Sequence, residues 1–271
     1  MNQIQPLLSV YPPHEARALY MLVMEAAFGL TPTQVLIGKD KELSEEKQAL
    51  LQNIIGRLIR KEPVQYILGQ ADFCGHTFQV EPGVLIPRPE TQELVNLINR
   101  QHPAPCSVLD IGTGSGCIAI SLALTGHRTT AFDISPDALR IARKNAQALH
   151  ADVDFEQEDI LHPSATAHQW DVIVSNPPYI CQKEARLMDV NVLDYEPHLA
   201  LFVPDENPLL FYRAIAGYAV THLKPSGRLY FEINEAYPQE TSSLLEHLGY
   251  THISVHPDNF GKSRFISATK A

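Results

Sequence analysis

The sequence has few of the features that mark disulfide-rich, metal-binding or membrane proteins. It contains four cysteines, Cys74, Cys106, Cys117 and Cys181. None of them belongs to a C-x-x-C pair, so neither a zinc cage nor a disulfide framework is expected. No apolar run reaches the length that spans a membrane, and the polar, proline-interrupted residues 1–10 do not resemble a signal peptide.

The chain also lacks an excess of basic residues. Lys and Arg number 21 against 31 Asp and Glu, which gives a formal net charge of −10. A protein that binds DNA or RNA through phosphates normally carries a basic surface. We therefore expect no direct nucleic-acid binding. The absences together favour a cytoplasmic protein without a metal site or membrane association, and a monomer is the expected state.

Residues 1–70 predict a small helical bundle. A helical stretch runs from His14 to Phe28 and ends at Gly29. Ser44 can cap a second long helix, which Pro63 is expected to end. The apolar residues of this second helix recur at a spacing of three and four, which predicts one buried stripe. They are Leu50, Leu51, Ile54, Ile55, Leu58 and Ile59.

Residues 71–88 predict a β-hairpin and linker, because weak alternation between Phe73 and Val80 precedes a turn at Pro82-Gly83. From there to residue 271 strands and helices alternate, after a helix marked by Leu94, Val95 and Ile98. The predicted strands are 106–110, 129–133, 153–156, 171–175, 228–233, 251–256 and 264–268. The predicted helices are 115–124, 136–149, 208–222 and 237–247. Residues 89–271 therefore predict a Rossmann-like α/β domain with a seven-stranded, mostly parallel sheet, whose final strand is antiparallel.

A glycine-rich loop follows the first strand of this domain. It consists of Gly112, Thr113, Gly114, Ser115 and Gly116. Glycines permit a tight turn and close approach of a ligand. The spacing G-x-G-x-G differs from the G-x-G-x-x-G that holds a dinucleotide pyrophosphate. It favours S-adenosyl-L-methionine, which has no phosphate. A structural turn and a nicotinamide site are the alternatives.

Two acidic residues follow later strands. Asp133 is placed to accept hydrogen bonds from ribose hydroxyls, and capping the helix that starts near Pro136 is its alternative role. Asp159 can accept from an adenine amino group with Ile160 beside the ring, and the alternative is an exposed loop acid. Carboxyl ends of parallel strands meet at one sheet edge, so these features predict a cofactor crevice there.

The residues after the fourth strand indicate the reaction. They are Asn176, Pro177, Pro178 and Tyr179. Two consecutive prolines remove two backbone donors, so the turn presents mainly acceptors. If Asn176 Oδ1 and the Pro177 carbonyl accept the hydrogens of a planar NH₂, its nitrogen is held in line with a sulfonium methyl group, and Asn176 also contacts the cofactor. Catalysis then comes from the orientation of the nitrogen and from acceptors that face the positive charge developing on it. Tyr179 is expected to lie over the flat group. An ordinary Asn-Pro turn is the alternative.

These motifs resemble those of the release factor glutamine methyltransferases, the PrmC/HemK family, over nearly the whole chain. Glu62 to Gly69 matches the inter-domain signature of that family, and Val84 to Thr91 matches its linker. Further correspondences are Tyr195-Glu196-Pro197, Ala200-Leu201, Asp258, Gly261 and Arg264.

The resemblance implies a class I methyltransferase fold. It implies methylation, by S-adenosyl-L-methionine, of glutamine N5 in the Gly-Gly-Gln motif of class-1 peptide chain release factors. It also implies that Gly112 to Gly116, Asp133 and Ile160 contact the cofactor and that Asn176 to Tyr179 hold the glutamine. Residues 1–70 are expected to help dock the release factor, and a purely stabilising bundle is the alternative.

Two positions depart from the family pattern. Phe202 to Pro208 contains no glycine where a glycine-containing turn is common, and Asn234 stands where a glycine is usual. The roles of Arg88 and Glu90 stay open, since they either brace the linker or serve as a salt bridge or helix start.

Two rival interpretations of the function stay open. One is an adenine-N6 or guanine-N2 methyltransferase acting on DNA or RNA, which the net charge disfavours. The other is a non-catalytic cofactor-sensing protein.

Overall fold

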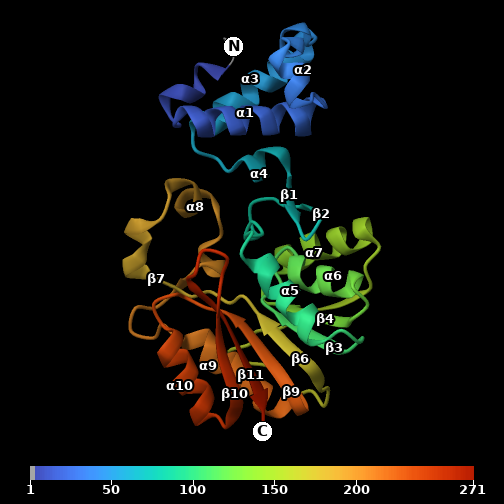
Figure 1. The fold of residues 1–271 in the computed structure, drawn as a ribbon, viewed down its shortest axis with the longest axis vertical. Helices are drawn as coiled ribbons and strands as arrows, with labels where there is room; N and C mark the ends of the chain where they lie inside the picture. The colour runs from blue at the N-terminus through green and yellow to red at the C-terminus, as the bar shows by residue number, and fades with distance from the viewer. Residues whose placement is uncertain (1–3) are drawn as a thin grey trace. The chain divides into compact units, whose positions relative to one another are not determined.

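The computed structural model describes residues 4–271 and divides into two compact units (Figure 1). Of the described residues, unit 1 contains 4–70 together with Asp189–Tyr195, and unit 2 contains Ala71–Met188 and Glu196–Ala271. The expected hairpin and linker, residues 71–88, belong to unit 2 in this division. The short segment Asp189–Tyr195, expected in the larger domain, belongs to unit 1.

Unit 1 is built of helices, as its periodicity predicts. They are α1 Pro13–Phe28, α2 Pro32–Leu36, α3 Glu45–Ile59, α4 Val64–Leu68 and α8 Val190–Tyr195, with short 3-10 helices η2 Leu7–Ser9 and η3 Lys39–Glu42. Gly29 ends α1 with a left-handed φ of 68°. Ser44 caps α3, because its side chain accepts a hydrogen bond from Lys47 N at 3.4 Å.

Two details of α3 differ from the prediction. Pro63 does not end this helix, which stops at Ile59, and instead precedes α4. The buried stripe is also narrower than predicted, since Leu50 is 48% and Ile59 37% exposed. Successive helical residues are about 100° apart, so six apolar residues cover a wider arc than one packing face. The four that are buried are Leu51, Ile54, Ile55 and Leu58.

The segment α8 is attached to the N-terminal helices of unit 1 by a tyrosine. Tyr195 Oη donates to the carbonyl of Arg60 at 2.9 Å, just after α3. Tyr11 Oη donates similarly to the carbonyl of Leu58 at 2.8 Å. These two hydroxyls bind carbonyls at the C-terminal end of α3, and the Leu58 carbonyl also accepts from Lys61 N at 2.8 Å.

Unit 2 contains a seven-stranded sheet in the order β10-β11-β9-β6-β3-β4-β5. Its strands are β3 Ser107–Ile111, β4 Arg128–Asp133, β5 Val153–Gln157, β6 Trp170–Ser175, β9 Leu223–Glu232, β10 Tyr250–Pro257 and β11 Ser263–Lys270. The five strands from β5 to β9 in this order are parallel, whereas β11 is antiparallel to both β9 and β10. The predicted Rossmann-like sheet with an antiparallel final strand is confirmed.

Helices cover both faces of this sheet (Figure 1). They are α5 Thr91–Gln101, α6 Cys117–Leu124, α7 Pro136–Leu149, α9 Leu210–His222 and α10 Pro238–His247. Alternate residues of β3 belong to different cores. Val108 packs with residues of α5 and α6, and Leu109 packs with residues of α9 and α10. This alternation is the period-two geometry of a strand buried on both faces.

Two small sheets complete unit 2. Strands β1 Gln70–Phe73 and β2 His76–Gln79 form a hairpin, which starts one residue before the predicted range 71–88. Its turn lies at Cys74-Gly75, so the prediction that the chain turns at Pro82-Gly83 to form the hairpin is wrong. Asn145 of α7 donates to the carbonyls of Gln79 and Ser115 at 3.0 and 2.9 Å, which ties the hairpin to the glycine loop. The second sheet pairs β7 Ile180–Cys181 with β8 Phe202–Val203 in parallel, flanked by η4 Gln182–Leu187 and η5 His198–Ala200.

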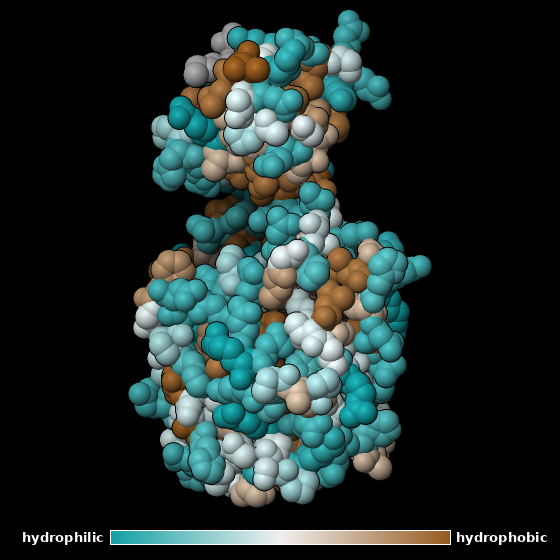
Figure 2. Space-filling view, turned by 45° about the vertical axis from the view of Figure 1, so that its right-hand side comes forward, coloured by the Kyte–Doolittle hydropathy of each residue, from teal (hydrophilic) through white to brown (hydrophobic). Residues whose placement is uncertain are grey.

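The glycine-free segment that departs from the family pattern therefore contains β8. After this strand it turns through a hydrogen bond from Asn207 N to the Pro204 carbonyl at 3.0 Å. The surface of unit 2 seen in Figure 2 is mainly hydrophilic, with apolar residues in separate patches. None of the helices formed by residues 4–271 combines the length and apolarity needed to cross a membrane.

Candidate active site

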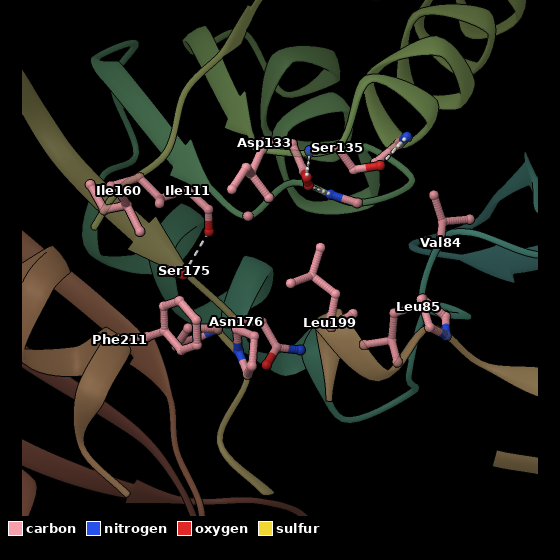
Figure 3. A pocket seen from close by; sticks show the side chains of 18 of the residues that line it. Val84, Leu85, Ile111, Asp133, Ser135, Ile160, Ser175, Asn176, Leu199 and Phe211 are labelled. Carbon is pink, nitrogen blue, oxygen red and sulfur yellow. Dashed lines mark hydrogen bonds between the residues drawn. The ribbon is translucent and has the colours of Figure 1, made fainter. Parts of the chain in front are cut away.

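A cavity of about 390 Å³ lies at the carboxyl ends of the central strands of unit 2. Figure 3 shows Ile111 and Asp133 on one side of it and Asn176 and Phe211 on the other. The predicted crevice is therefore present, and it lies where ligands bind in open α/β sheets. The predicted residues on its wall are Gly112, Gly114, Asp133, Asp159, Ile160, Asn176, Pro177 and Pro178.

Gly112 and Gly114 form the part of the glycine loop that lines the cavity. Both have left-handed backbones, with φ of 76° and 56°. The Gly112 amide donates to the Phe132 carbonyl at 2.9 Å, which holds the loop against the end of β4. A Cβ atom built on either glycine would meet no protein atom within 4 Å. Because these glycines have no side chains, the space along the cavity wall stays open.

Three other residues of the predicted loop do not line the cavity. Gly116 lies between α6 and α7, where a Cβ atom would come within 2.7 Å of Ile120 Cδ1 and 3.1 Å of Ala142 Cβ. Thr113 and Ser115 are buried. The sequence grouped all five loop residues as cofactor contacts, but the structure separates packing positions from cavity positions.

Asp110 is a buried acid of the loop region that the sequence reasoning did not select. Burial raises the pKa of its carboxyl to about 7. Thr113 Oγ1 donates to Asp110 Oδ2 at 2.7 Å, which partly offsets this effect. The sequence contains a signal for this buried acid, because Asp110 lies in a short apolar strand almost directly before the glycines.

Asp133 holds the loop and the start of α7 through its two carboxylate oxygens. Oδ2 accepts from Gly114 N at 2.8 Å, and Oδ1 accepts from Ser135 N at 2.9 Å. Burial raises the pKa of Asp133, and these backbone donors oppose that shift. The helix cap is Ser135, which accepts from Ala138 N at 3.2 Å. The alternative role of Asp133 as that cap is therefore not observed.

Asp159 also lines the cavity, but local groups engage its carboxylate. Oδ2 pairs with His162 Nδ1 at 2.9 Å and Oδ1 accepts from Leu161 N at 2.9 Å. The interaction with His162 is the main cause that lowers the pKa of Asp159. The next residue, Ile160, lies on the cavity wall and packs against the core around α9. Of the pair, Ile160 is the better placed to contact a flat ring.

Asn176 and the two prolines form the corner at the end of β6. Ser175 Oγ donates to the Ile111 carbonyl at 2.6 Å and so fixes the corner to β3 (Figure 3). Asn176 Nδ2 donates to Thr91 Oγ1 at 3.4 Å. No side chain or amide among residues 4–271 donates to Asn176 Oδ1. This oxygen is therefore a free acceptor on a partly buried side chain at the cavity wall.

Tyr179 is held by hydrogen bonds at both its hydroxyl and its carbonyl. It is not part of the cavity wall, and its ring packs against the core of unit 2. Its Oη donates to Glu232 Oε1 at 3.2 Å, and its carbonyl accepts from Asn234 Nδ2 at 3.1 Å. Burial raises the pKa of Tyr179 well above its ordinary value, which keeps the hydroxyl a neutral donor. The Glu232 carboxylate thus fixes the hydroxyl end of the ring, and the position of Tyr179 over a flat acceptor group stays a prediction.

Several site residues escaped the sequence reasoning. Glu232, at the end of β9, is buried and accepts from Thr91 Oγ1 at 2.6 Å. Leu199, Phe211 and Ile215 form an apolar part of the cavity wall. Apolar helix residues carry no motif, so only their place beside the sheet edge reveals them.

The linker is tied to the segment after α8. Arg88 Nη2 lies 2.6 Å from Glu196 Oε1, and Ile86 N donates to Glu196 Oε2 at 3.1 Å. Arg88 therefore has the salt-bridge role and Glu90 the helix-start role that are the alternatives to bracing, since Glu90 directly precedes α5. The linker residues Val84 and Leu85 are held at the cavity wall (Figure 3).

Comparisons with known proteins agree with this architecture. The family model described as PrmC N-terminal domain matches residues 5–69, and the Methyltransferase small domain model matches residues 89–193. A release factor glutamine methyltransferase from Bacteroides thetaiotaomicron is 50% identical over 100% of both chains. A second, from Flavobacterium psychrophilum, is 40% identical and covers 97% of this chain and 95% of its own length.

Solved structures show the same fold at low identity. A methyltransferase from Pyrococcus furiosus has a TM-score of 0.56 at 17% identity, covering 84% of this chain and 100% of its own. The T. thermophilus 16S rRNA methyltransferase RsmC, in complex with AdoMet and guanosine, has a TM-score of 0.53 at 19% identity. That match covers 74% of this chain and 50% of the other. At these identities the likeness concerns the fold alone.

Proposed function

This chain belongs to the release factor glutamine methyltransferase family, and we propose that its cavity carries out methyl transfer to the side-chain nitrogen of glutamine. The acceptor is the glutamine of the Gly-Gly-Gln motif in class-1 peptide chain release factors. The methyl donor is S-adenosyl-L-methionine, which supplies a methyl group on a positively charged sulfur.

The residues of the cavity suit this donor. Asp133 offers a charged acceptor for ribose hydroxyls, and its position is held by two backbone amides. Gly112 and Gly114 let a ligand approach the backbone without a side chain in the way. Ile160 and Phe211 offer apolar surface for the adenine ring. An apolar cavity with a few fixed polar groups is typical of cofactor sites.

The free Oδ1 atom of Asn176 carries the proposal for the acceptor. A glutamine amide nitrogen is a poor nucleophile, because its lone pair is delocalised into the carbonyl. Asn176 Oδ1 and the Pro177 carbonyl can accept the two amide hydrogens and thereby orient the nitrogen. Pro177 has no N–H of its own that would compete. On transfer the bond from sulfur to the methyl carbon would break as the bond to nitrogen forms, the neutral thioether would be the leaving group, and the nitrogen would release one proton to solvent. The acceptors stabilise the positive charge that develops on nitrogen before this proton leaves, so catalysis rests on orientation and electrostatics.

Peptide mass analysis tests this function. The purified enzyme is incubated with S-adenosyl-L-methionine and a class-1 release factor expressed without methylation. We expect one added methyl group on the Gly-Gly-Gln glutamine. Asn176→Ala should lower kcat by about 10²–10³, as removal of a single charge-stabilising group does elsewhere, while cofactor binding survives.

Nucleic acids provide the contrasting substrate. Duplex DNA and ribosomal RNA are offered with labelled cofactor under the same conditions. Label on nucleic acid alone would refute the glutamine acceptor and support the amino-methylating alternative. Unchanged turnover in Asn176→Ala would exclude the role of the corner while leaving the family assignment intact.

We also propose that the enzyme is a monomer that does not bind nucleic acid directly and that residues 1–70 help dock the release factor. The net charge of −10 supports the second point, since phosphate contacts need basic side chains. Light scattering tests the monomer, and crosslinking to the release factor followed by peptide mapping tests the docking. Crosslinks confined to residues 71–271 would contradict the docking role.

A further inference from the structure

Two consecutive hydrogen bonds, the first partly buried and the second buried, lead from the cavity wall into the interior of unit 2. Asn176 Nδ2 donates to Thr91 Oγ1 at 3.4 Å, and Thr91 Oγ1 donates to Glu232 Oε2 at 2.6 Å. Thr91 is the first residue of α5 and Glu232 the last residue of β9. Both are 2% exposed. Three segments that are distant in sequence therefore converge behind the Asn176 carboxamide.

The direction of each hydrogen bond follows from the donors available. A threonine hydroxyl has one hydrogen, and an ionised carboxylate has none. The 2.6 Å distance between Thr91 Oγ1 and Glu232 Oε2 is typical of a hydroxyl that donates to a charged oxygen. The hydrogen of Thr91 is therefore used on Glu232. Towards Asn176, Thr91 can only accept.

The pKa of Glu232 is raised overall, and three of its neighbours oppose that shift. Burial is the largest effect and raises its pKa, as does the nearby Glu90. Thr91, the positive charge of Arg264 on β11 and the Tyr179 hydroxyl act in the opposite direction. Arg264 is itself held by Asp258, whose Oδ2 accepts from Arg264 Nε at 3.2 Å.

This polarity determines which atom of the Asn176 carboxamide faces the cavity. The oxygen and the nitrogen of an amide have nearly the same shape, so only hydrogen bonds distinguish the two orientations. With Thr91 restricted to accepting, Nδ2 must point to Thr91 and Oδ1 must point away from it. In the reversed orientation two acceptor oxygens would face each other, and an NH₂ group would be offered to the substrate NH₂.

We propose that Thr91 and Glu232 are positioning residues for methyl transfer, which keep Asn176 Oδ1 turned towards the acceptor amide. This inference rests on the proposed function and assigns a task to two residues that do not line the cavity. It also explains why Tyr179 lies away from the cavity wall. Its hydroxyl donates to Oε1 of Glu232, the carboxylate oxygen that Thr91 does not use, and so stabilises the negative charge of Glu232.

The test compares two substitutions at one site. Thr91→Val keeps the shape of the side chain but removes the hydroxyl, whereas Thr91→Ser keeps the hydroxyl. We expect Thr91→Val to lower kcat on a release factor by about tenfold or more, because small errors of orientation in a reacting group have effects of this size. Cofactor Kd should stay within about twofold, and Thr91→Ser should recover most of kcat.

A matched control separates positioning from stability. Thr241 in α10 is 0% exposed, and its Oγ1 donates to the Tyr237 carbonyl at 2.7 Å, far from Asn176 in the chain. Thr241→Val therefore removes an equally buried, hydrogen-bonded hydroxyl. It should lower the Tm but leave kcat near that of the unmodified enzyme.

The outcomes distinguish this inference from the function on which it rests. If the unmodified enzyme does not methylate the release factor, the proposed function fails. If that enzyme is active and Thr91→Val retains full kcat, the positioning role is refuted. The positioning role is refuted as well if Thr241→Val, at the same loss of Tm as Thr91→Val, loses as much kcat as that variant. Thr91→Ala carries the same comparison if the valine variant does not fold.

Discussion

Alanine at Gly116 is expected to destabilise the protein more than alanine at Gly112 or Gly114. All three glycines have positive φ, with values of 82°, 76° and 56°. A left-handed backbone costs a residue with a Cβ atom about 1–2 kcal/mol, and this part of the effect is shared by all three variants. The surroundings of the added methyl group make the difference.

At Gly116 the added Cβ atom would lie 2.7 Å from Ile120 Cδ1 and 3.1 Å from Ala142 Cβ. Ile120 is fully buried and Ala142 is part of α7, so neither can move without disturbing the packing of α6 against α7. Overpacking of this kind costs about 1–3 kcal/mol. Gly116→Ala should therefore lose about 2–5 kcal/mol of unfolding free energy, against about 1–2 kcal/mol for Gly112→Ala and Gly114→Ala.

Urea unfolding without cofactor measures these losses, and calorimetric titration measures cofactor binding. The order for binding should be reversed. Gly114→Ala places its methyl group at the cavity wall, and we expect about a tenfold weaker Kd for S-adenosyl-L-methionine. Gly116→Ala, studied where it is folded, should bind within about threefold of the unmodified enzyme. Equal losses of stability in the three variants would refute the distinction between packing and cavity glycines.

Two further variants concern the acids behind the loop. Asp133→Asn should weaken cofactor binding by about tenfold or more. The two carboxylate oxygens accept from Gly114 N and Ser135 N, and an amide replaces one of these oxygens by an NH₂ group, which cannot accept. Titration calorimetry that finds unchanged affinity would contradict this. Burial raises the pKa of Asp110 from 3.8 to about 7, so the folded state binds this proton more tightly than the unfolded state. The unmodified protein should thus lose up to about 4 kcal/mol of unfolding free energy, relative to Asp110→Asn, as the pH rises from about 4 to about 7. If the difference in unfolding free energy between the two proteins does not change with pH, Asp110 is not responsible.

The amino-acid sequence by itself determined the secondary structure and the place of the cavity. Hydrophobic periodicity, together with residues such as Gly29 and Ser44 at helix ends, predicts most of the helices and strands, because these signals act over a few residues. The glycine loop, Asp133 and Asn176 follow successive parallel strands. Strand ends of this kind meet at one sheet edge whatever the details of packing. The motifs from Glu62 to Gly69 and from Val84 to Thr91 further indicated the family.

Only the tertiary structure decided which residues work together. Thr91 and Glu232 are 141 positions apart, and they meet because α5 packs beside the end of β9. The same packing draws Tyr179 away from the cavity and makes Gly116 a contact between helices. Hydrogen-bond partners and close packing depend on the order of strands and the filling of the core. Neither leaves a local pattern in the chain, which is why sequence reasoning named the corner but not the residues that orient it.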